Sequence, residues 1–254
     1  MTVQDLIAAL DIPGNCRVDQ RVPKKLLVEN GAPTASDKRQ INDGIEEIQW
    51  LASLKPNTIG VPEFRDDVRE YLEIAVLSVT LRSDAKAGRL AELVHRAVPY
   101  PVVLLLNTAQ SLTLSMAHKR WAQNEADKMV LDGNVVAVTL PGKPPASAFE
   151  ATFMRAFGLG RQPQTTLYAL YQGWIDTLTA LQAAQITGRF VASATPEQAA
   201  ARRVALLCCR DIDSRIASLR TSAAKEKQVA RQVAINLEIK ALQAERSAVF
   251  AKIE

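Results

Sequence analysis

Several residue types that often carry chemistry are scarce in this chain of 254 residues. It contains three cysteines, two histidines and only 5% aromatic residues. Two of the cysteines, Cys208 and Cys209, are adjacent, which suits neither a disulfide bridge nor a CxxC ligand pair. The scarcity excludes a disulfide framework and a histidine-rich metal site, and we expect a reducing, cytoplasmic compartment.

Long hydrophobic runs are also absent. The best apolar run, residues 102–106, has the length of a strand and falls far short of the ~18 residues that cross a bilayer. The first ten residues contain Asp5 and no basic leader, so we expect neither a secretory signal nor a membrane partner. With 48% hydrophobic residues, the chain can still bury a sizeable core.

Familiar catalytic motifs are missing as well. No HExxH, calcium-loop, P-loop or GxSxG pattern occurs in the sequence. We therefore expect no metal, no cofactor and no catalytic residue of these classes.

The N-terminal region predicts an extended segment followed by a helix. Residues 12–31 read as extended, with a loop-forming end at Asn30-Gly31. Thr34 and Asp37 have capping-box spacing, and an amphipathic helix is predicted over residues 36–54. Its apolar residues recur at steps of four, three and three: Ile41, Ile45, Ile48 and Leu51.

Residues 61–145 carry the pattern of a mixed sheet. Strands are predicted over 71–82, over 99–107, over 111–117 and over 134–140, with helices over 87–98 and up to about Leu131. The resulting β-α-β-β-α-β order predicts an α+β (mixed α/β) domain over residues 1–145, with the N-terminal segment and helix in residues 1–60.

The remainder, residues 146–254, is predicted to be helical. A proline-rich link over 140–147 precedes helices over 148–157 and 165–187, and Thr195 caps an arm that begins at Pro196. The arm is either one long coiled coil or two helices joined near residues 222–225. Its apolar stripes are expected to bind a partner: Ile212, Ile216 and Leu219, then Ile235, Ile239, Leu242 and Val249.

The charge of the chain is concentrated in this arm. The formal net charge is +4, and residues 196–254 hold 11 basic and 7 acidic residues, which leaves residues 1–195 balanced. A weak nucleic-acid interface is therefore a second hypothesis, and the arm contributes Arg202, Arg203 and Arg210 to it.

The stretch "SLTLSMAHKRWAQ", residues 111–123, adds a cationic and aromatic end to an alternating strand. If the strand continues past Ala117, His118 and Arg120 share one face while Lys119 and Trp121 share the other. If it ends there, a helix begins and the cations decorate its first turns. Two further alternatives are that Lys119 and Arg120 contact phosphate, with Trp121 as a stacking surface, or that this end of the segment binds a protein.

A third hypothesis is a divergent metal-dependent nuclease around Glu73. Glu73 opens the right kind of strand, and Asp66, Asp67 and Glu70 precede it. Position 75 is alanine, however, so the lysine of a Glu-x-Lys pair is missing.

Taken in order, several segments resemble a known bacterial family, the domain of unknown function 4391. They are "SDKRQINDGIEEIQWLASLKPNTIGV", "YLEIAVLSVTLR", "LVHRAVPYPVVLLL", "AHKRW" and "KEKQVARQVAINLEIKALQAE", which together span most of residues 15–245. The more family-like positions are Trp50, Tyr100, Lys119, Arg120 and Asn236.

The resemblance implies an accessory role beside Swi/Snf-type helicases and type III-like DNA methyltransferases in antiviral defence. It supplies no catalytic residues. The first hypothesis is thus a non-enzymatic accessory subunit that docks a helicase or methyltransferase, or forms a homodimer, through its C-terminal helices.

Overall fold

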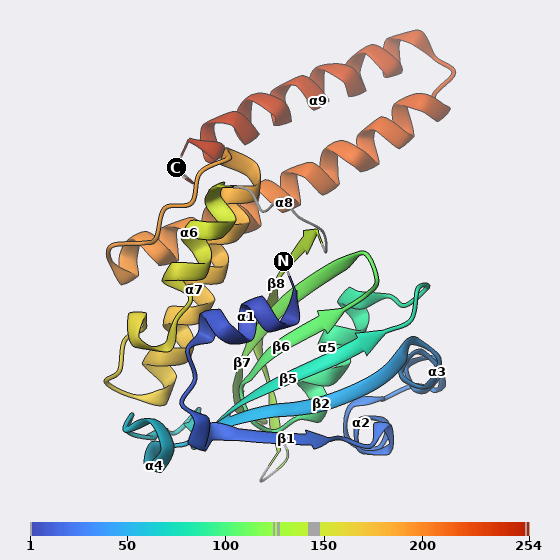
Figure 1. The fold of residues 1–254 in the computed structure, drawn as a ribbon. Helices are drawn as coiled ribbons and strands as arrows, with labels where there is room; N and C mark the ends of the chain where they lie inside the picture. The colour runs from blue at the N-terminus through green and yellow to red at the C-terminus, as the bar shows by residue number, and fades with distance from the viewer. Residues whose placement is uncertain (1, 124, 126–127, 142–147, 252, 254) are drawn as a thin grey trace. The chain divides into compact units, whose positions relative to one another are not determined.

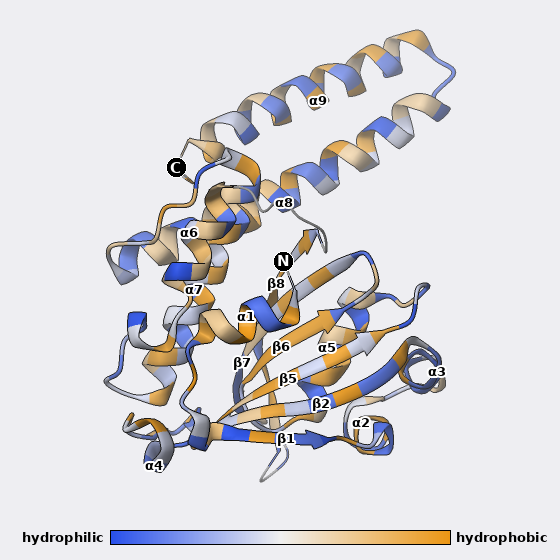
Figure 2. Cartoon of the chain, in the orientation of Figure 1, coloured by the Kyte–Doolittle hydropathy of each residue, from blue (hydrophilic) through white to orange (hydrophobic). Residues whose placement is uncertain are grey.

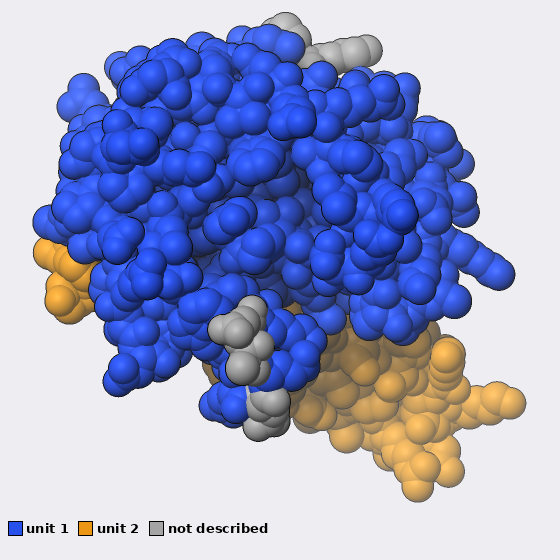
Figure 3. Space-filling view, turned by 90° about the horizontal axis from the view of Figure 1, so that it is seen from below, with its two compact units in different colours: residues 1–178 blue, residues 179–254 orange. Residues whose placement is uncertain are grey.

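A computed structural model describes residues 2–123, 125, 128–141, 148–251 and 253 (Figure 1). The chain divides into two compact units, residues 1–178 and residues 179–254 (Figure 3). The boundary falls inside helix α7 (Leu167–Thr187), so helix α6 (Ala148–Ala156) belongs to the first unit. The fold is mixed α+β, with a sheet in the first unit and helices in the second.

The sheet of the first unit has six strands in the order β1-β2-β5-β6-β7-β8. Only the β5–β6 pair is parallel, and the other neighbours are antiparallel. A separate ribbon is formed by β3 (Phe64–Arg65) and β4 (Glu70–Tyr71). The six strands are β1 (Arg17–Arg21), β2 (Ile45–Leu54), β5 (Ile74–Leu81), β6 (Val102–Asn107), β7 (Ser111–Trp121) and β8 (Met129–Pro141).

Helices cover both faces of this sheet. On one face, α2 (Lys24–Gly31), α3 (Ala35–Gly44) and α5 (Ala87–Ala97) pack on β2, β5 and β6 around buried aliphatic residues such as Ile48 and Leu104. The opposite face carries α1 (Val3–Leu10), seen in front of the sheet in Figure 1. A short helix, α4 (Pro56–Ile59), follows β2. No helix among the described residues is long and apolar enough to span a membrane.

The helix predicted over residues 36–54 is wrong in its second half. The Thr34 cap is confirmed, since its hydroxyl accepts the Asp37 amide at 3.1 Å, but α3 ends at Gly44 and β2 begins at Ile45. The pairing of β2 with β5 shifts register twice, which is the mark of β-bulges. The first bulge inserts a residue, so Ile45 and Ile48 reach the same core three residues apart, while Leu51 lies beside α1 instead; the resulting spacing imitates a helix.

The extended segment predicted over residues 12–31 is also only partly correct. It contains strand β1, but its second half is helix α2. Gly31 ends that helix against α5, where an added Cβ would lie 2.6 Å from the Leu93 carbonyl oxygen. The glycine therefore permits close helix packing, and the sequence pattern mistook it for a loop signal.

The helix predicted before Leu131 is absent from the described residues. Strand β7 continues to Trp121 and β8 begins at Met129, so the two form one long hairpin. The Ala122 amide bonds the Lys128 carbonyl at 2.8 Å and closes it. Of the predicted proline-rich link, residues 142–147 lie outside the described part of the chain.

The second unit contains a helical hairpin. Helix α8 (Pro196–Lys225) starts at the predicted Thr195 cap, and α9 (Val229–Phe250) runs back along it (Figure 1). Residues 226–228 separate the two helices. Of the two alternatives for the arm, the structure therefore has two helices rather than one.

Strand β7 extends beyond β6, its neighbour on one side. The β6–β7 pairing ends at Leu104 and Ser115, so the next β7 amides on that side, at 117, 119 and 121, have lost their strand partner. The Tyr171 hydroxyl accepts the Ala117 amide at 3.1 Å and donates to the Val102 carbonyl at 2.7 Å. The Tyr71 hydroxyl accepts the Lys119 amide, and the Val68 carbonyl accepts the Trp121 amide. Two side-chain hydroxyls and one backbone carbonyl thus replace the missing strand.

Replacing Tyr171 with Phe tests whether its hydroxyl takes the place of the missing strand partner. Tyr171 is fully buried, so the variant leaves the Ala117 amide and the Val102 carbonyl without their bridge. We expect the free energy of unfolding to fall by about 2 kcal/mol in urea titrations.

The matched control is Tyr168→Phe, because Tyr168 is half-buried on the same helix. We expect it to change stability by less than about 0.5 kcal/mol. Equal losses in the two variants would contradict the role given to the Tyr171 hydroxyl.

Candidate functional site

The overrunning end of β7 places His118 in a hydrogen-bonded chain. The Tyr71 hydroxyl lies 2.6 Å from Nδ1 of His118, and Oε1 of Gln172 lies 2.9 Å from Nε2. Nε2 of Gln172 in turn donates to Asp176 at 2.8 Å. Because the Gln172 oxygen can only accept, Nε2 carries the proton and the Tyr71 hydroxyl donates to Nδ1. Both ring nitrogens of His118 are therefore engaged: Nε2 links β7 to helix α7, and Nδ1 links β7 to β4.

Aromatic rings and one carboxylate surround this histidine. Tyr168 lies 5.2 Å from the His118 ring and stacks on Phe64 at 4.9 Å. Arg69 lies over the Tyr168 ring at 5.5 Å, and its guanidinium contacts Asp132 at 2.8 and 2.6 Å. The cluster ties the β3–β4 ribbon to β8 and α7.

Lys119 points to the other face of the sheet and has no exposed surface. Its ammonium donates to the carbonyls of His95 and Val98, the latter at 2.8 Å, at the C-terminal end of α5. Burial lowers the pKa of Lys119 to about 7. The same burial, with the nearby Lys119 charge, lowers the pKa of His95 to about 3, and the neutral His95 ring bonds the Ser115 hydroxyl at 2.9 Å. Lys119 thus satisfies the last turn of a helix.

The residues expected to contact nucleic acid at this end of β7 do not form one surface. The alternative in which the strand continues past Ala117 holds, and Lys119 is turned into the core. Arg120 and Trp121 are half-buried, and Arg120 donates to the Trp121 carbonyl at 3.0 Å. Of the three, only these two have side chains that reach solvent.

Glu73 lies at the start of β5 and is nearly buried. One of its carboxylate oxygens lies 3.2 Å from the Lys55 ammonium, and the other has no partner in the described part of the chain. Nearby, Glu70 pairs with Arg65, and Asp66 accepts the amides of Val68 and Arg69. Over the residues that the structure describes, no three His, Cys, Asp or Glu side chains are grouped to hold a metal ion.

All seven residues expected to bind a partner lie between the two helices of the hairpin. Four of them form a buried cluster: Ile212, Ile216, Ile239 and Leu242. The other three are partly buried against it: Leu219, Ile235 and Val249. Arg246 closes one side with two bonds to Asp213, at 2.6 and 3.1 Å. The predicted apolar seam is real, but in this structure it packs the chain against itself.

A second apolar stripe, which sequence reasoning missed, lies on the outside of α9. Val229, Val233 and Leu237 are 73%, 52% and 63% exposed, and they recur at steps of four. On a helix of 3.6 residues per turn they lie away from the seam residues Ile239 and Leu242. In Figure 2 both blue and orange segments mark the outside of this helix. The signal was present in the sequence but was overshadowed by the stronger isoleucine stripe.

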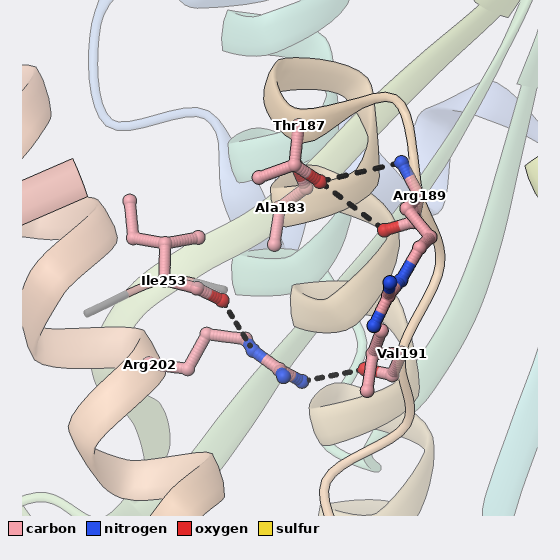
Figure 4. Close-up of a pocket in the computed structure, with 6 residues that line it drawn as sticks. All are labelled: Ala183, Thr187, Arg189, Val191, Arg202 and Ile253. Carbon is pink, nitrogen blue, oxygen red and sulfur yellow. Dashed lines mark hydrogen bonds between the residues drawn. The ribbon is translucent and has the colours of Figure 1, made fainter. Parts of the chain in front are cut away.

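The three arm arginines expected to contact nucleic acid have different surroundings. Arg202 is only 3% exposed and bonds the carbonyls of Val191 and Ile253 and the hydroxyl of Ser193. It lines a cavity of about 260 Å³ with Arg189 and Thr187 (Figure 4). Arg202 therefore fastens segments of the second unit together. Arg203 is half-buried, and Arg210 is exposed.

Two of the family-like positions share a groove on the first unit. Trp50 and Tyr100 both line an apolar groove of about 310 Å³, together with Leu26 and Val98. The Trp50 indole donates to the Ala52 carbonyl at 2.8 Å, which holds its ring in place. A third family-like residue, Asn236, is exposed on α9.

The buried Lys119 predicts a pH dependence of stability. Between pH 7 and about 10.5 the unfolded chain holds a proton that the folded chain has released, so stability rises with pH in this window. The raised pKa values of Tyr71 and Tyr171 reverse the trend above pH ~10. We therefore expect urea titrations from pH 7 to ~9.5 to show a gain of at most about 1.4 kcal/mol per pH unit, and Lys119→Met to lose it.

Lys128→Met is the control for this measurement, because Lys128 is an exposed lysine paired with Glu125. We expect it to keep the wild-type pH profile. A Lys119→Met protein whose stability still rises with pH as steeply as the wild type would contradict the assignment.

Comparison with known proteins places the chain in a family. A search of curated proteins gave no match, and a search of solved structures gave none either. The family model described as a domain of unknown function (DUF4391) matches residues 10–245, which is nearly the whole chain. The protein therefore belongs to the family of the domain of unknown function 4391.

Proposed function

We propose that this protein is a non-enzymatic accessory subunit that assembles through the outer face of helix α9. The observation that carries the proposal is the exposed stripe of Val229, Val233 and Leu237 on a helix whose other face is already buried against α8. Large apolar side chains aligned along one exposed helix face are typical of an interface with another helix.

The occupant that fits this face is a second copy of the chain. The stripe continues toward the C-terminus with small exposed residues, Ala241, Ala244 and Ala248. When two α9 helices run antiparallel about a two-fold axis, the large half of each meets the small half of the other. Val229 then faces Ala248, Val233 faces Ala244, and Leu237 faces Ala241. The first two pairs share one register, and the third lies one residue away from it.

The end of β7 supports a role in assembly rather than catalysis. Both nitrogens of His118 are bonded, and Lys119 is held by carbonyls inside the core. Glu73 pairs with Lys55. Among the residues that the structure describes, no group of three His, Cys, Asp or Glu side chains could hold a metal ion. His118, Lys119 and Glu73 thus each contact a structural partner.

The resemblance to a family beside helicases and DNA methyltransferases suggests the setting of this assembly. We propose that the dimer serves such a DNA-handling, antiviral system as an accessory component. Co-expression of the chain with the helicase or methyltransferase encoded beside it, followed by affinity purification, tests this setting. Stoichiometric co-purification supports it, and separate elution of the two proteins contradicts it.

Replacing Leu237 with Asp tests the α9 interface. Leu237 is 63% exposed, so the change leaves the fold of the isolated chain intact but places a charge in the interface. By light scattering during size exclusion we expect the wild type at twice the 27.8 kDa chain mass and the variant at the mass of one chain.

Gln243→Asp provides the matched control, because Gln243 is exposed on the same helix outside the stripe. We expect it to stay dimeric. Leu242→Asp is unsuitable as a test, because Leu242 is buried in the hairpin seam and its loss would disrupt the hairpin itself. A wild-type protein at the mass of one chain, or a dimer that survives Leu237→Asp, would overturn the proposed pairing.

A further inference from the structure

The tip of the hairpin carries a dense group of positive charges. Residues 215–231 contain five basic residues and one acidic residue, Glu226. The five are Arg215, Arg220, Lys225, Lys227 and Arg231, and each is exposed. They occupy the end of α8, the connection and the first turns of α9, so they share one end of the hairpin.

This tip accounts for the net charge of the whole chain. Outside residues 215–231 the sequence has 26 basic and 26 acidic residues, which cancel. Elsewhere in the hairpin, basic residues are balanced by acidic neighbours, as in the Arg246–Asp213 pair. The excess of +4 is therefore local to one end of one element.

Few carboxylates neutralise the tip. Arg215 lies 3.9 Å from Glu238, and Glu226 accepts the Gln228 amide at 2.8 Å, which closes the turn between the helices. Among the described residues, no ion pair involves Arg220, Lys225, Lys227 or Arg231. Four unpaired cations at an exposed tip create a field that attracts a polyanion.

From this arrangement we infer that the hairpin tip binds the phosphate backbone of nucleic acid. The surrounding side chains are hydroxyls and amides, among them Thr221, Ser222 and Gln232, which are common phosphate contacts. No aromatic residue occurs within residues 215–231, so base stacking is not part of the contact. Val229 is the only large apolar residue there that is exposed, too little for insertion into a lipid surface.

The inferred site differs from the nucleic-acid surface expected from sequence. Lys119 and Arg202, two members of that surface, are buried and hold backbone carbonyls. The tip residues begin at Arg215, which lies 13 residues after Arg202 on the same helix. Binding through the tip does not depend on the α9 pairing, because the stripe and the tip use different side chains.

The salt dependence of binding tests the inference. The full chain is titrated into a labelled short DNA duplex of mixed sequence, and fluorescence anisotropy is read between about 50 and 200 mM KCl. For four phosphate contacts, log Kobs falls against log [KCl] with a slope near −3.6, since each contact contributes about −0.9. We expect the double variant Lys225→Gln/Lys227→Gln to bind more weakly and to reduce the steepness of the slope by about 2.

The matched control removes two exposed cations from elsewhere in the same hairpin, Arg210→Gln/Lys240→Gln. It changes the net charge equally and is expected to retain the wild-type slope. Parallel titrations with polyglutamate and with phosphatidylserine vesicles distinguish nucleic acid from other anionic partners, and we expect both to bind at least tenfold more weakly than the duplex.

Two results would overturn the inference. One is a slope that changes equally in the tip and control variants, which would assign binding to net charge alone. The other is binding of polyglutamate or vesicles as tight as that of the duplex. We expect Leu237→Asp to leave the slope of log Kobs against log [KCl] unchanged. A failure of the proposed dimer can therefore be distinguished from a failure of the proposed nucleic-acid site.

Discussion

The first unit depends on how the sheet satisfies the backbone amides of β7 that lie beyond the start of β6. Backbone amides that lose a strand partner inside a protein must find another acceptor or cost free energy. Two tyrosine hydroxyls, from Tyr171 and Tyr71, and the Val68 carbonyl supply the three acceptors. This arrangement brings α7 and the β3–β4 ribbon to the sheet, and it determines that His118 meets α7 while Lys119 meets α5.

The cationic motif at the end of β7 is consequently part of the architecture. A buried lysine is costly unless its ammonium is hydrogen-bonded, and the terminal carbonyls of a helix are suitable acceptors. Lys119 and α5 satisfy each other in this way, and His95 remains neutral beside them. His118 and Lys119, which the sequence presents as a cationic end of a strand, thus serve to hold α7 and α5 to the sheet.

The hairpin of the second unit separates three roles on its surface. Its inner seam of isoleucine and leucine holds α8 to α9. The outside of α9 presents the exposed stripe that includes Leu237, and the far end carries unpaired cations that include Lys225. The inner seam, the exposed stripe and the charged end thereby use different side chains, so that each can be altered by substitution without replacing residues of the other two.

The sequence by itself determined the mixed α+β class, the strands at β5 and β6, helices α5 to α8 and the Thr34 and Thr195 caps, because these depend on local periodicity and capping. It also determined that the arm has an apolar seam. Only the tertiary structure decided that Ile45 and Ile48 belong to a bulged strand, because bulges imitate helical spacing. The tertiary structure likewise decided which cations are buried: Lys119 and Arg202 are buried, whereas Lys225 and Lys227 are exposed. Whether a charge is buried depends on which distant carbonyls the fold brings to it, and a linear pattern does not contain that information.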